Sequence, residues 1–271
     1  MKNGIRYDDL QNLPEPFKVV QGDWSRSSFY GLELPLRLMI RVSNGTEPVT
    51  VIETYGGIAT VFVTRSNLSR LGVWCGGSAF SVNLTGDPGV AIFVPPFSII
   101  RWQISAGCHE WYCYGLPLDA LPRHEELPIH PAAMNWDDAQ LFRTPKMLAE
   151  QLISRRSEWD VFKPSTMPSD LVAAVKRQLD LRFKEFVKIQ DICAEIGTSP
   201  NYISRAFKDY YGLGPQEYLA ELRVFESQRE ILFKDGQNLI ASGFNAGFQD
   251  VSRFNKNFKR RFGHSPRKFI K

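Results

Sequence analysis

The sequence predicts an α+β protein of two domains, in which an N-terminal antiparallel β-barrel or sandwich is followed by an all-α domain. Three observations lead to this prediction: short β-rich runs fill residues 48–116, hydrophobic residues recur at helical spacing beyond residue 145, and the C-terminal part repeats itself after 51 residues. A length of 271 residues with 43% hydrophobic and 23% charged content is typical of a globular protein and excludes a wholly disordered chain.

Six runs in the first half have the length and the Val, Ile, Phe, Thr and Trp content of β-strands. Turn-forming pairs such as Gly56-Gly57 and Pro95-Pro96 separate them. Short strands at regular spacing favour an antiparallel barrel or sandwich, which we expect within residues 1–120. The six runs are residues 49–54, 58–64, 79–84, 90–94, 99–104 and 111–116.

Residues 121–167 are expected to form a connector that carries one helix over residues 145–156. Leu141, Pro145, Leu148 and Leu152 are spaced by four, three and four residues, so this helix would present one apolar stripe. Two interpretations stay open for the stripe of Leu141, Leu148 and Leu152: it forms a homodimer contact, or it packs on the β-domain of its own chain. A linker at residues 163–168 then leads to a helical domain at residues 168–271.

Basic residues are concentrated in the C-terminal domain. Residues 168–271 hold 18 Lys and Arg against 12 Asp and Glu, whereas residues 1–167 hold 15 against 17. From Arg253 to Lys271 there are eight basic residues and no acidic one. This charge favours a polyanion such as double-stranded DNA, the alternative being a merely solvated basic tail.

No run approaches the roughly 18 apolar residues of a membrane-spanning helix, and the N-terminus lacks the pattern of a secretory signal. We therefore expect a cytoplasmic protein without a membrane partner. Four cysteines in a chain of this length do not make a disulfide scaffold, so reduced thiols are expected.

The repeat divides the C-terminal domain into two helix-turn-helix units, with Phe207 falling on Phe258 and Gly212 on Gly263. In the first unit, residues 189–196 form a helix that ends before Gly197. Ser199 and Pro200 then supply the N-cap and the first-turn proline of the next helix. Asp250 is the expected N-cap of the corresponding helix in the second unit.

The second helix of each unit is expected to combine a buried face with a polar face that enters the major groove. The inward residues are Ile203, Ala206, Phe207 and Tyr210 in the first unit, and Phe254, Phe258 and Phe262 in the second. Hydroxyls, amides and cations on the other face suit base edges and phosphates, although a solvated face is the alternative. The outward residues are Asn201, Ser204, Arg205 and Lys208, and Ser252, Asn255, Lys256 and Lys259.

Residues 199–212 (SPNYISRAFKDYYG), the following GPQEYL and residues 246–270 (AGFQDVSRFNKNFKRRFGHSPRKFI) resemble the DNA-binding domain of the AraC/XylS family of bacterial transcriptional regulators. The resemblance implies a linker helix over residues 215–233, a homodimer, and RNA polymerase as a partner. It fits an activator, although the sequence does not decide between activation and repression. The base-contacting positions it implies are Asn201, Ser204 and Arg205, and Val251, Ser252, Asn255 and Lys256.

The sequence departs from the family pattern at Ser242-Gly243, where the family usually has Ile-Ala in the supporting helix of the second unit. Glycine in a helix interior costs up to about 1 kcal/mol relative to alanine, so a weak or bent supporting helix is expected. On that interpretation, a Gly243→Ala substitution would tighten DNA binding. Cys193 is the corresponding small residue of the first unit and is expected in the core.

Family members often carry an N-terminal cupin-type β-barrel that binds a small effector, and the strand-rich half is similar in length and position. Such a pocket would use aromatic walls and a few polar groups, which suggests Trp74, Arg101, Trp102 and Trp111, although tryptophans are more often simply core. The alternatives are a constitutive regulator whose N-terminal half only dimerises or binds a protein partner, and a cupin-like enzyme.

An enzyme is disfavoured because the sequence shows no nucleophile elbow, phosphate loop or dinucleotide-binding turn. Cys108, His109, Glu110 and Cys113 form the only cluster resembling metal ligands, and their spacing is too irregular for zinc. We expect no catalytic residue, no metal and no cofactor.

Overall fold

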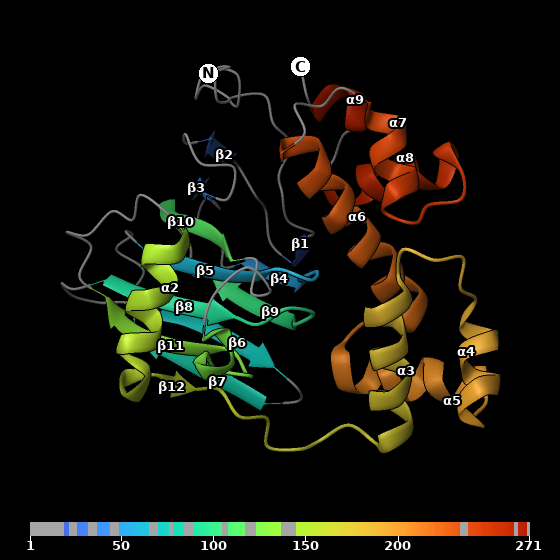
Figure 1. The fold of residues 1–271 in the computed structure, drawn as a ribbon, viewed down its shortest axis with the longest axis horizontal. Helices are drawn as coiled ribbons and strands as arrows, with labels where there is room; N and C mark the ends of the chain where they lie inside the picture. The colour runs from blue at the N-terminus through green and yellow to red at the C-terminus, as the bar shows by residue number, and fades with distance from the viewer. Residues whose placement is uncertain are drawn as a thin grey trace. The chain divides into compact units, whose positions relative to one another are not determined.

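The computed structural model describes residues 19–21, 26–31, 37–43, 49–64, 70–75, 78–83, 89–104, 108–116, 123–136, 145–233, 238–262 and 265–269. The chain divides into two compact units. The main segments of the first are Met1–Cys75 and Ala79–Lys163, and that of the second is Pro164–Ile270. The first unit is built mainly from strands and the second from helices (Figure 1).

The described strands of the first unit form two sheets. One sheet has five strands in the order β1 (Val19–Gln21), β4 (Val49–Thr54), β9 (Ile99–Ile104), β6 (Arg70–Cys75) and β7 (Ser78–Asn83). The other has seven, in the order β12 (Asp160–Val161), β11 (Ala132–Trp136), β8 (Gly89–Val94), β5 (Ala59–Thr64), β10 (Cys108–Leu116), β3 (Arg37–Ser43) and β2 (Arg26–Gly31).

The described strands do not close into a barrel, so the cupin-like barrel is not confirmed, whereas the alternative of an antiparallel sandwich agrees with them. A barrel requires the first and last strands of a sheet to pair with each other, and each of these sheets instead has two end strands. The ring of Phe62 on β5 packs edge-on against that of Trp102 on β9, with centroids 5.6 Å apart, so the two sheets face each other there. This half is therefore a two-sheet structure, in which β11 and β12 come from the segment expected to be a connector.

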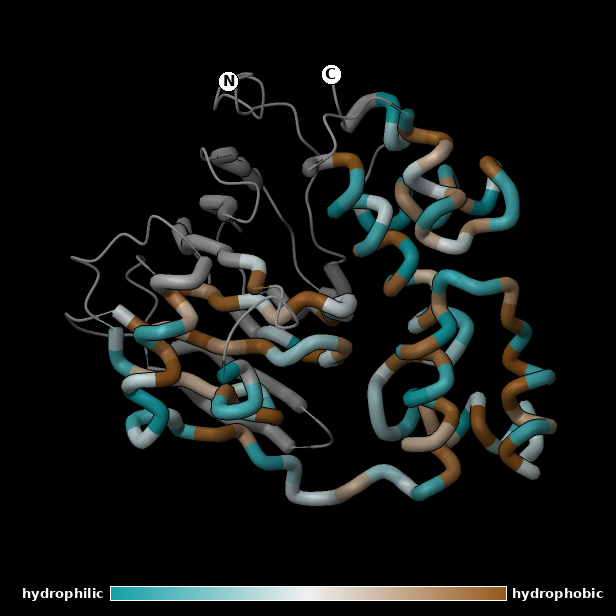
Figure 2. Tube along the Cα trace, in the orientation of Figure 1, coloured by the Kyte–Doolittle hydropathy of each residue, from teal (hydrophilic) through white to brown (hydrophobic). Residues whose placement is uncertain are grey.

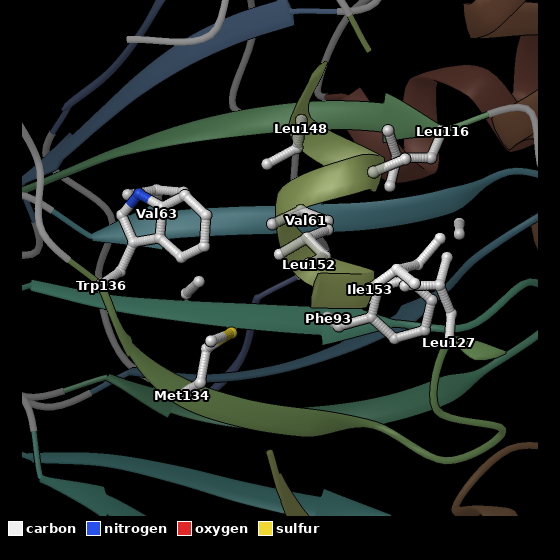
Figure 3. Close-up of a cluster of buried hydrophobic side chains, with 13 residues drawn as sticks. Val61, Val63, Phe93, Leu116, Leu127, Met134, Trp136, Leu148, Leu152 and Ile153 are labelled. Atoms are coloured by element: carbon white, nitrogen blue, oxygen red, sulfur yellow. The ribbon is translucent and has the colours of Figure 1, made fainter. Parts of the chain in front are cut away.

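Helix α2 (Pro145–Ser154) covers the outer face of the seven-stranded sheet (Figure 1). Its Leu148 and Leu152 are fully buried among residues of β5, β8, β10 and β11, as Figure 3 shows. Val61 and Val63 face α2, whereas Phe62 between them faces the other sheet, as the alternation of a strand requires.

The dimer contact predicted through Leu141, Leu148 and Leu152 is wrong for the two leucines that the structure describes. Both are fully buried in their own unit, so neither is available to a second chain. Leu141 lies outside the described residues. The apolar stripe of α2 serves the core of its own domain, because the sheet beneath it offers a matching apolar face.

The second unit contains short helices with alternating hydrophobic and hydrophilic residues (Figure 2). Ser169 caps the first of them by accepting a hydrogen bond from the Val172 amide at 3.4 Å. Val172, Val175 and Leu179 of this helix are buried, whereas Leu171 at its start is exposed. The helices are α3 (Asp170–Arg182), α4 (Ile189–Ile196), α5 (Pro200–Tyr211), α6 (Pro215–Phe233), α7 (Leu239–Asn245), α8 (Val251–Phe262) and α9 (Pro266–Phe269).

Candidate nucleic-acid interface

Helix α5 is the second helix of the first unit and begins where the sequence predicts. The Ser199 hydroxyl accepts the Tyr202 amide at 3.2 Å, and Pro200 occupies the first turn. Gly212 ends the helix with a left-handed φ of 81°, where a side chain would be strained. These signals fix where the helix begins and ends, and the helical spacing then sets which of its residues share a face.

The two faces of α5 differ sharply. Ile203 and Phe207 are fully buried, and Phe207 packs against the ring of Tyr218 on α6. The expected outward residues Asn201, Ser204, Arg205 and Lys208 are all exposed. The side of α5 away from the core therefore presents an amide, a hydroxyl and two cations, which can pair with base edges and phosphate oxygens.

Helix α8 repeats this arrangement in the second unit. The Asp250 carboxylate caps it by accepting the Arg253 amide at 2.6 Å, while Phe254 and Phe258 are buried. The side chain of Phe262 lies outside those described. The expected DNA-facing residues Val251, Ser252, Asn255 and Lys256 are all exposed, as is Lys259.

The first unit is supported by α4, whose buried residues are Ile189, Ile192 and Cys193. Cys193 lies in the core as expected, and burial raises the pKa of its thiol. Gly197 ends α4 with a φ of 77°, and no atom lies within 4 Å of the place where its side chain would begin. Conformation alone therefore explains this glycine.

The second supporting helix, α7, is formed despite its glycine. Asn238 caps it by accepting the Ala241 amide at 3.0 Å, and Ser242 and Gly243 are both buried. A methyl group at Gly243 would lie 2.6 Å from Cδ1 of Phe254 on α8. This contact argues against the expectation that Gly243→Ala would tighten DNA binding, because the missing side chain makes room for the phenylalanine ring.

The basic end of α8 is only partly available to a phosphate backbone. Arg261 is buried and pairs with Glu221 of α6 at 2.8 Å, and Arg260 donates to the same carboxylate at 3.0 Å. The run of basic residues from Arg253 to Lys271 predicted a polyanion or solvent as the surroundings of both arginines. The sequence did not indicate their partner, because Glu221 lies 40 residues away in sequence from Arg261.

A hydrogen bond to a partly buried carboxylate connects α6 to α3. The buried Tyr218 hydroxyl donates to Asp180 at 2.5 Å, and Lys176 pairs with the same carboxylate at 2.7 Å. Burial outweighs the attraction of Lys176 and raises the pKa of Asp180. Burial and the adjacent Asp180 raise the pKa of the Tyr218 hydroxyl further above its ordinary value, so it remains a hydrogen-bond donor.

Two tyrosines of α5 hold the chain that leads into α3. Tyr210 was expected in the core, but it is half-buried and its hydroxyl donates to the Thr166 carbonyl at 2.7 Å. Tyr202 is exposed, and its hydroxyl lies 3.4 Å from that of Ser169. The linker residues are thus attached to the helix expected to read DNA.

The candidate effector residues of the first unit lie on three strands. Trp74 is on β6, Arg101 and Trp102 are on β9, and Trp111 is on β10. Trp102 is buried and its indole N–H donates to the Tyr55 hydroxyl at 3.2 Å, whereas Arg101 is exposed. Arg101 and Trp102 therefore point to opposite faces of β9 and do not line one pocket together.

Within the described part of the chain, no group of three or more His, Cys, Asp or Glu side chains is arranged to hold a metal ion. The side chains of Cys108, His109, Glu110 and Cys113 lie outside those described. Among the described helices, none is both long enough and apolar enough to span a bilayer.

Comparisons with known proteins show which proteins the second unit resembles. A family model described as a helix-turn-helix domain matches residues 192–271. The transcriptional activator RhaS of Escherichia fergusonii is 34% identical over 89 residues, covering 33% of this chain and 32% of RhaS. The Msm operon regulatory protein of Streptococcus mutans is 32% identical over 101 residues, covering 37% of this chain and 36% of that protein.

A likeness in fold extends over more of the chain. A crystal structure of ToxT from Vibrio cholerae with a bound unsaturated fatty acid covers 92% of this chain and 97% of ToxT, with 10% identity and a TM-score of 0.50. In sequence, however, the chain spans about a third of the length of the curated relatives named above. The matched residues, the repeated capped helices and the regulators they resemble identify the C-terminal part of this chain as a helix-turn-helix domain of the AraC/XylS family.

Proposed function

We propose that the chain is a transcriptional regulator that binds double-stranded DNA sequence-specifically with both α5 and α8. One observation carries the proposal: the two helices are capped in the same way, bury aromatic residues on one side, and expose matched polar and basic residues on the other. The helix-turn-helix match and the regulators among the relatives support it.

Each exposed side chain has a role that its chemistry suits. Arg205 can donate two parallel hydrogen bonds to a guanine, and Asn201 and Asn255 can pair with adenine. Ser204, Ser252 and Lys256 offer further donors, and Val251 offers an apolar contact for a thymine methyl group. Lys208 and Lys259 suit phosphate oxygens, which position the protein without specifying sequence.

Enrichment of the full chain's binding sites from a random duplex library tests the proposal. We expect an enriched site with two conserved segments about one helical turn apart, because two recognition helices on one face of DNA read successive major grooves. The double variant Arg205→Ala/Lys256→Ala should lose the enrichment, whereas Arg177→Ala, which removes an exposed cation from α3, should retain it. Equal binding of all sequences by the wild-type chain would contradict the proposal.

We propose further that the first unit makes the regulator responsive to a small organic effector. The two-sheet architecture and the buried aromatic group of Tyr55, Phe62 and Trp102 support this, as does the fatty acid bound to ToxT, whose fold is similar. Ligand-induced thermal stabilisation, screened with fatty acids and other small organic molecules, tests it. A constitutive regulator would instead bind its DNA site with the same affinity whatever molecule is added.

A homodimer, RNA polymerase as a partner and a cytoplasmic location complete the proposal. The family resemblance supports all three, but Leu148 and Leu152 of α2 are buried in their own unit and do not supply the dimer contact. Light scattering of the free chain and of its complex with the enriched DNA gives the stoichiometry directly. A single chain in both measurements would contradict the homodimer.

A further inference from the structure

Residues 183–185, between α3 and α4, are contacted by two elements that lead to the second helix-turn-helix unit. Helix α6 contacts them through Arg223, and the turn between α7 and α8 approaches them at Gly247. They belong to the support of the first unit, so these contacts join the two units directly. We call residues 183–185 the joint.

Arg223 of α6 holds the joint through two carbonyl groups. Its Nε donates to the Phe183 carbonyl at 2.7 Å and its Nη2 to the Glu185 carbonyl at 2.8 Å. Burial lowers the pKa of Arg223 to about 10, with a smaller contribution from the charge of Arg253, so the guanidinium stays charged at neutral pH. One turn further along α6, Glu226 accepts a hydrogen bond from Lys184 at 2.6 Å.

Gly247 approaches the joint from the second unit. A methyl group there would lie 2.6 Å from the Phe183 carbonyl oxygen and 2.8 Å from the Lys184 Cα. Its φ of 97° also favours glycine. Gly197, the turn glycine of the first unit, has no atom within 4 Å of the same position, so close backbone packing distinguishes the second turn from the first.

Arg223 forms hydrogen bonds to the joint, and Gly247 packs closely against it. We propose that these contacts set the separation and angle of α5 and α8, and therefore the spacing of the two DNA segments that the domain accepts. Arg223 and Gly247 are positioning residues in this proposal, which rests on the proposed DNA-binding function. A guanidinium that bonds two backbone carbonyls restricts rotation as well as distance, because its donors lie in one rigid plane.

The test uses the full chain and the DNA site that the wild-type protein enriches. Affinities are measured for that site and for versions with one or two base pairs inserted between, or deleted from, its two segments. The wild-type protein should prefer one spacing. Arg223→Met and Gly247→Ala should each reduce the affinity ratio between the preferred and altered spacings about tenfold, as expected when charge-assisted hydrogen bonds or close packing at the joint are lost.

A merely structural role would give a different pattern, because a smaller folded fraction lowers the affinity for every spacing by the same factor. Arg223→Lys retains the cation and should give an intermediate ratio, which keeps the test available if Arg223→Met does not fold by circular dichroism. Arg177→Met, which removes an exposed cation, should leave the ratio unchanged. An unchanged ratio in folded Arg223 and Gly247 variants would overturn the joint alone, whereas absence of any enriched wild-type site would overturn the proposed function and the joint together.

Discussion

Gly243 of α7 lies directly against the ring of Phe254 of α8, so close that a methyl group on the glycine would be 2.6 Å from Cδ1 of the ring. Phe254 is buried, and its ring also packs against Phe248 and Phe258. Moving this ring would therefore disturb its contacts with both of these aromatic residues. The two helices of the second unit are held together by a glycine that, from helix propensity alone, would be expected to weaken them.

Gly243→Ala should destabilise the protein by about 1–3 kcal/mol, the usual cost of overpacking a core. Chemical denaturation followed by circular dichroism measures the change in free energy of unfolding. Gly214→Ala is the matched control, because no atom lies within 4 Å of the added methyl group, and it should cost less. A stabilised Gly243→Ala protein would show that the helix preference of alanine outweighs the contact with Phe254.

Glu221→Gln should destabilise the protein by about 3 kcal/mol, because it removes the carboxylate that pairs with the buried cation of Arg261. Glu195→Gln removes the carboxylate of an exposed pair with Arg182 and should cost much less, because solvent screens that pair. Denaturation of the two variants side by side gives the difference. Similar costs would mean that the buried pair contributes no more than a surface pair.

Lys259→Ala should weaken binding to all DNA sequences alike and reduce the slope of log affinity against log salt concentration by about one, as loss of one phosphate contact does. The salt dependence of binding, measured by fluorescence anisotropy, reports this slope. Arg261→Met should instead lower the free energy of unfolding, since Arg261 is buried. A normal salt slope for Lys259→Ala would place that lysine in solvent.

Glu226 should make stability depend on pH in the acid range. Burial opposes its charge, but hydrogen bonds from Arg229 and Lys184 outweigh burial and hold its pKa below the ordinary value of 4.5. A lowered folded-state pKa stabilises the protein above pH 4.5, and this stabilisation is lost as pH falls through the folded-state pKa. The difference in unfolding free energy between wild type and Glu226→Gln should therefore shrink as the pH falls below 4.5. A difference that stays constant would contradict the shift.

Leu148→Ala should destabilise the first unit by about 2–5 kcal/mol, because the side chain is fully buried between α2 and the sheet. Ile129→Ala removes a similar side chain that is 83% exposed and should change stability little. Thermal unfolding followed by tryptophan fluorescence measures both. Unchanged stability for Leu148→Ala would contradict the burial of this side chain and would again make it a candidate for a contact between chains.

Local signals were enough to predict much of the second unit from sequence. A cap such as Ser199 or Asp250 and a stop such as Gly197 act within a few residues, so the bounds of α4 and the start of α5 are confirmed. The bounds of α6, which the family resemblance implied, are confirmed as well. The exposed faces of α5 and α8 followed from spacing within one helix. Their DNA contacts stay a prediction.

Features that depend on residues distant in sequence could not be predicted. The partner of Arg261, the fit of Gly243 to Phe254 and the burial of Leu148 each arise where separate elements meet. The pairing order of the strands, which leaves the described sheets open, is likewise a property of the whole unit. Hydrophobic spacing indicates that a face is buried, but not which surface covers it.

The central claim is that α5 and α8 each read one segment of a two-part DNA site, and competition binding tests it most directly. Affinities are compared for the enriched site and for two versions in which only one segment is scrambled. Arg205→Ala should lose about 1–3 kcal/mol on the intact site and become insensitive to the base that Arg205 reads in one segment, while keeping its dependence on the other segment. Lys256→Ala should show the converse. If both substitutions affected the same segment, or neither changed any base preference, the account would be contradicted.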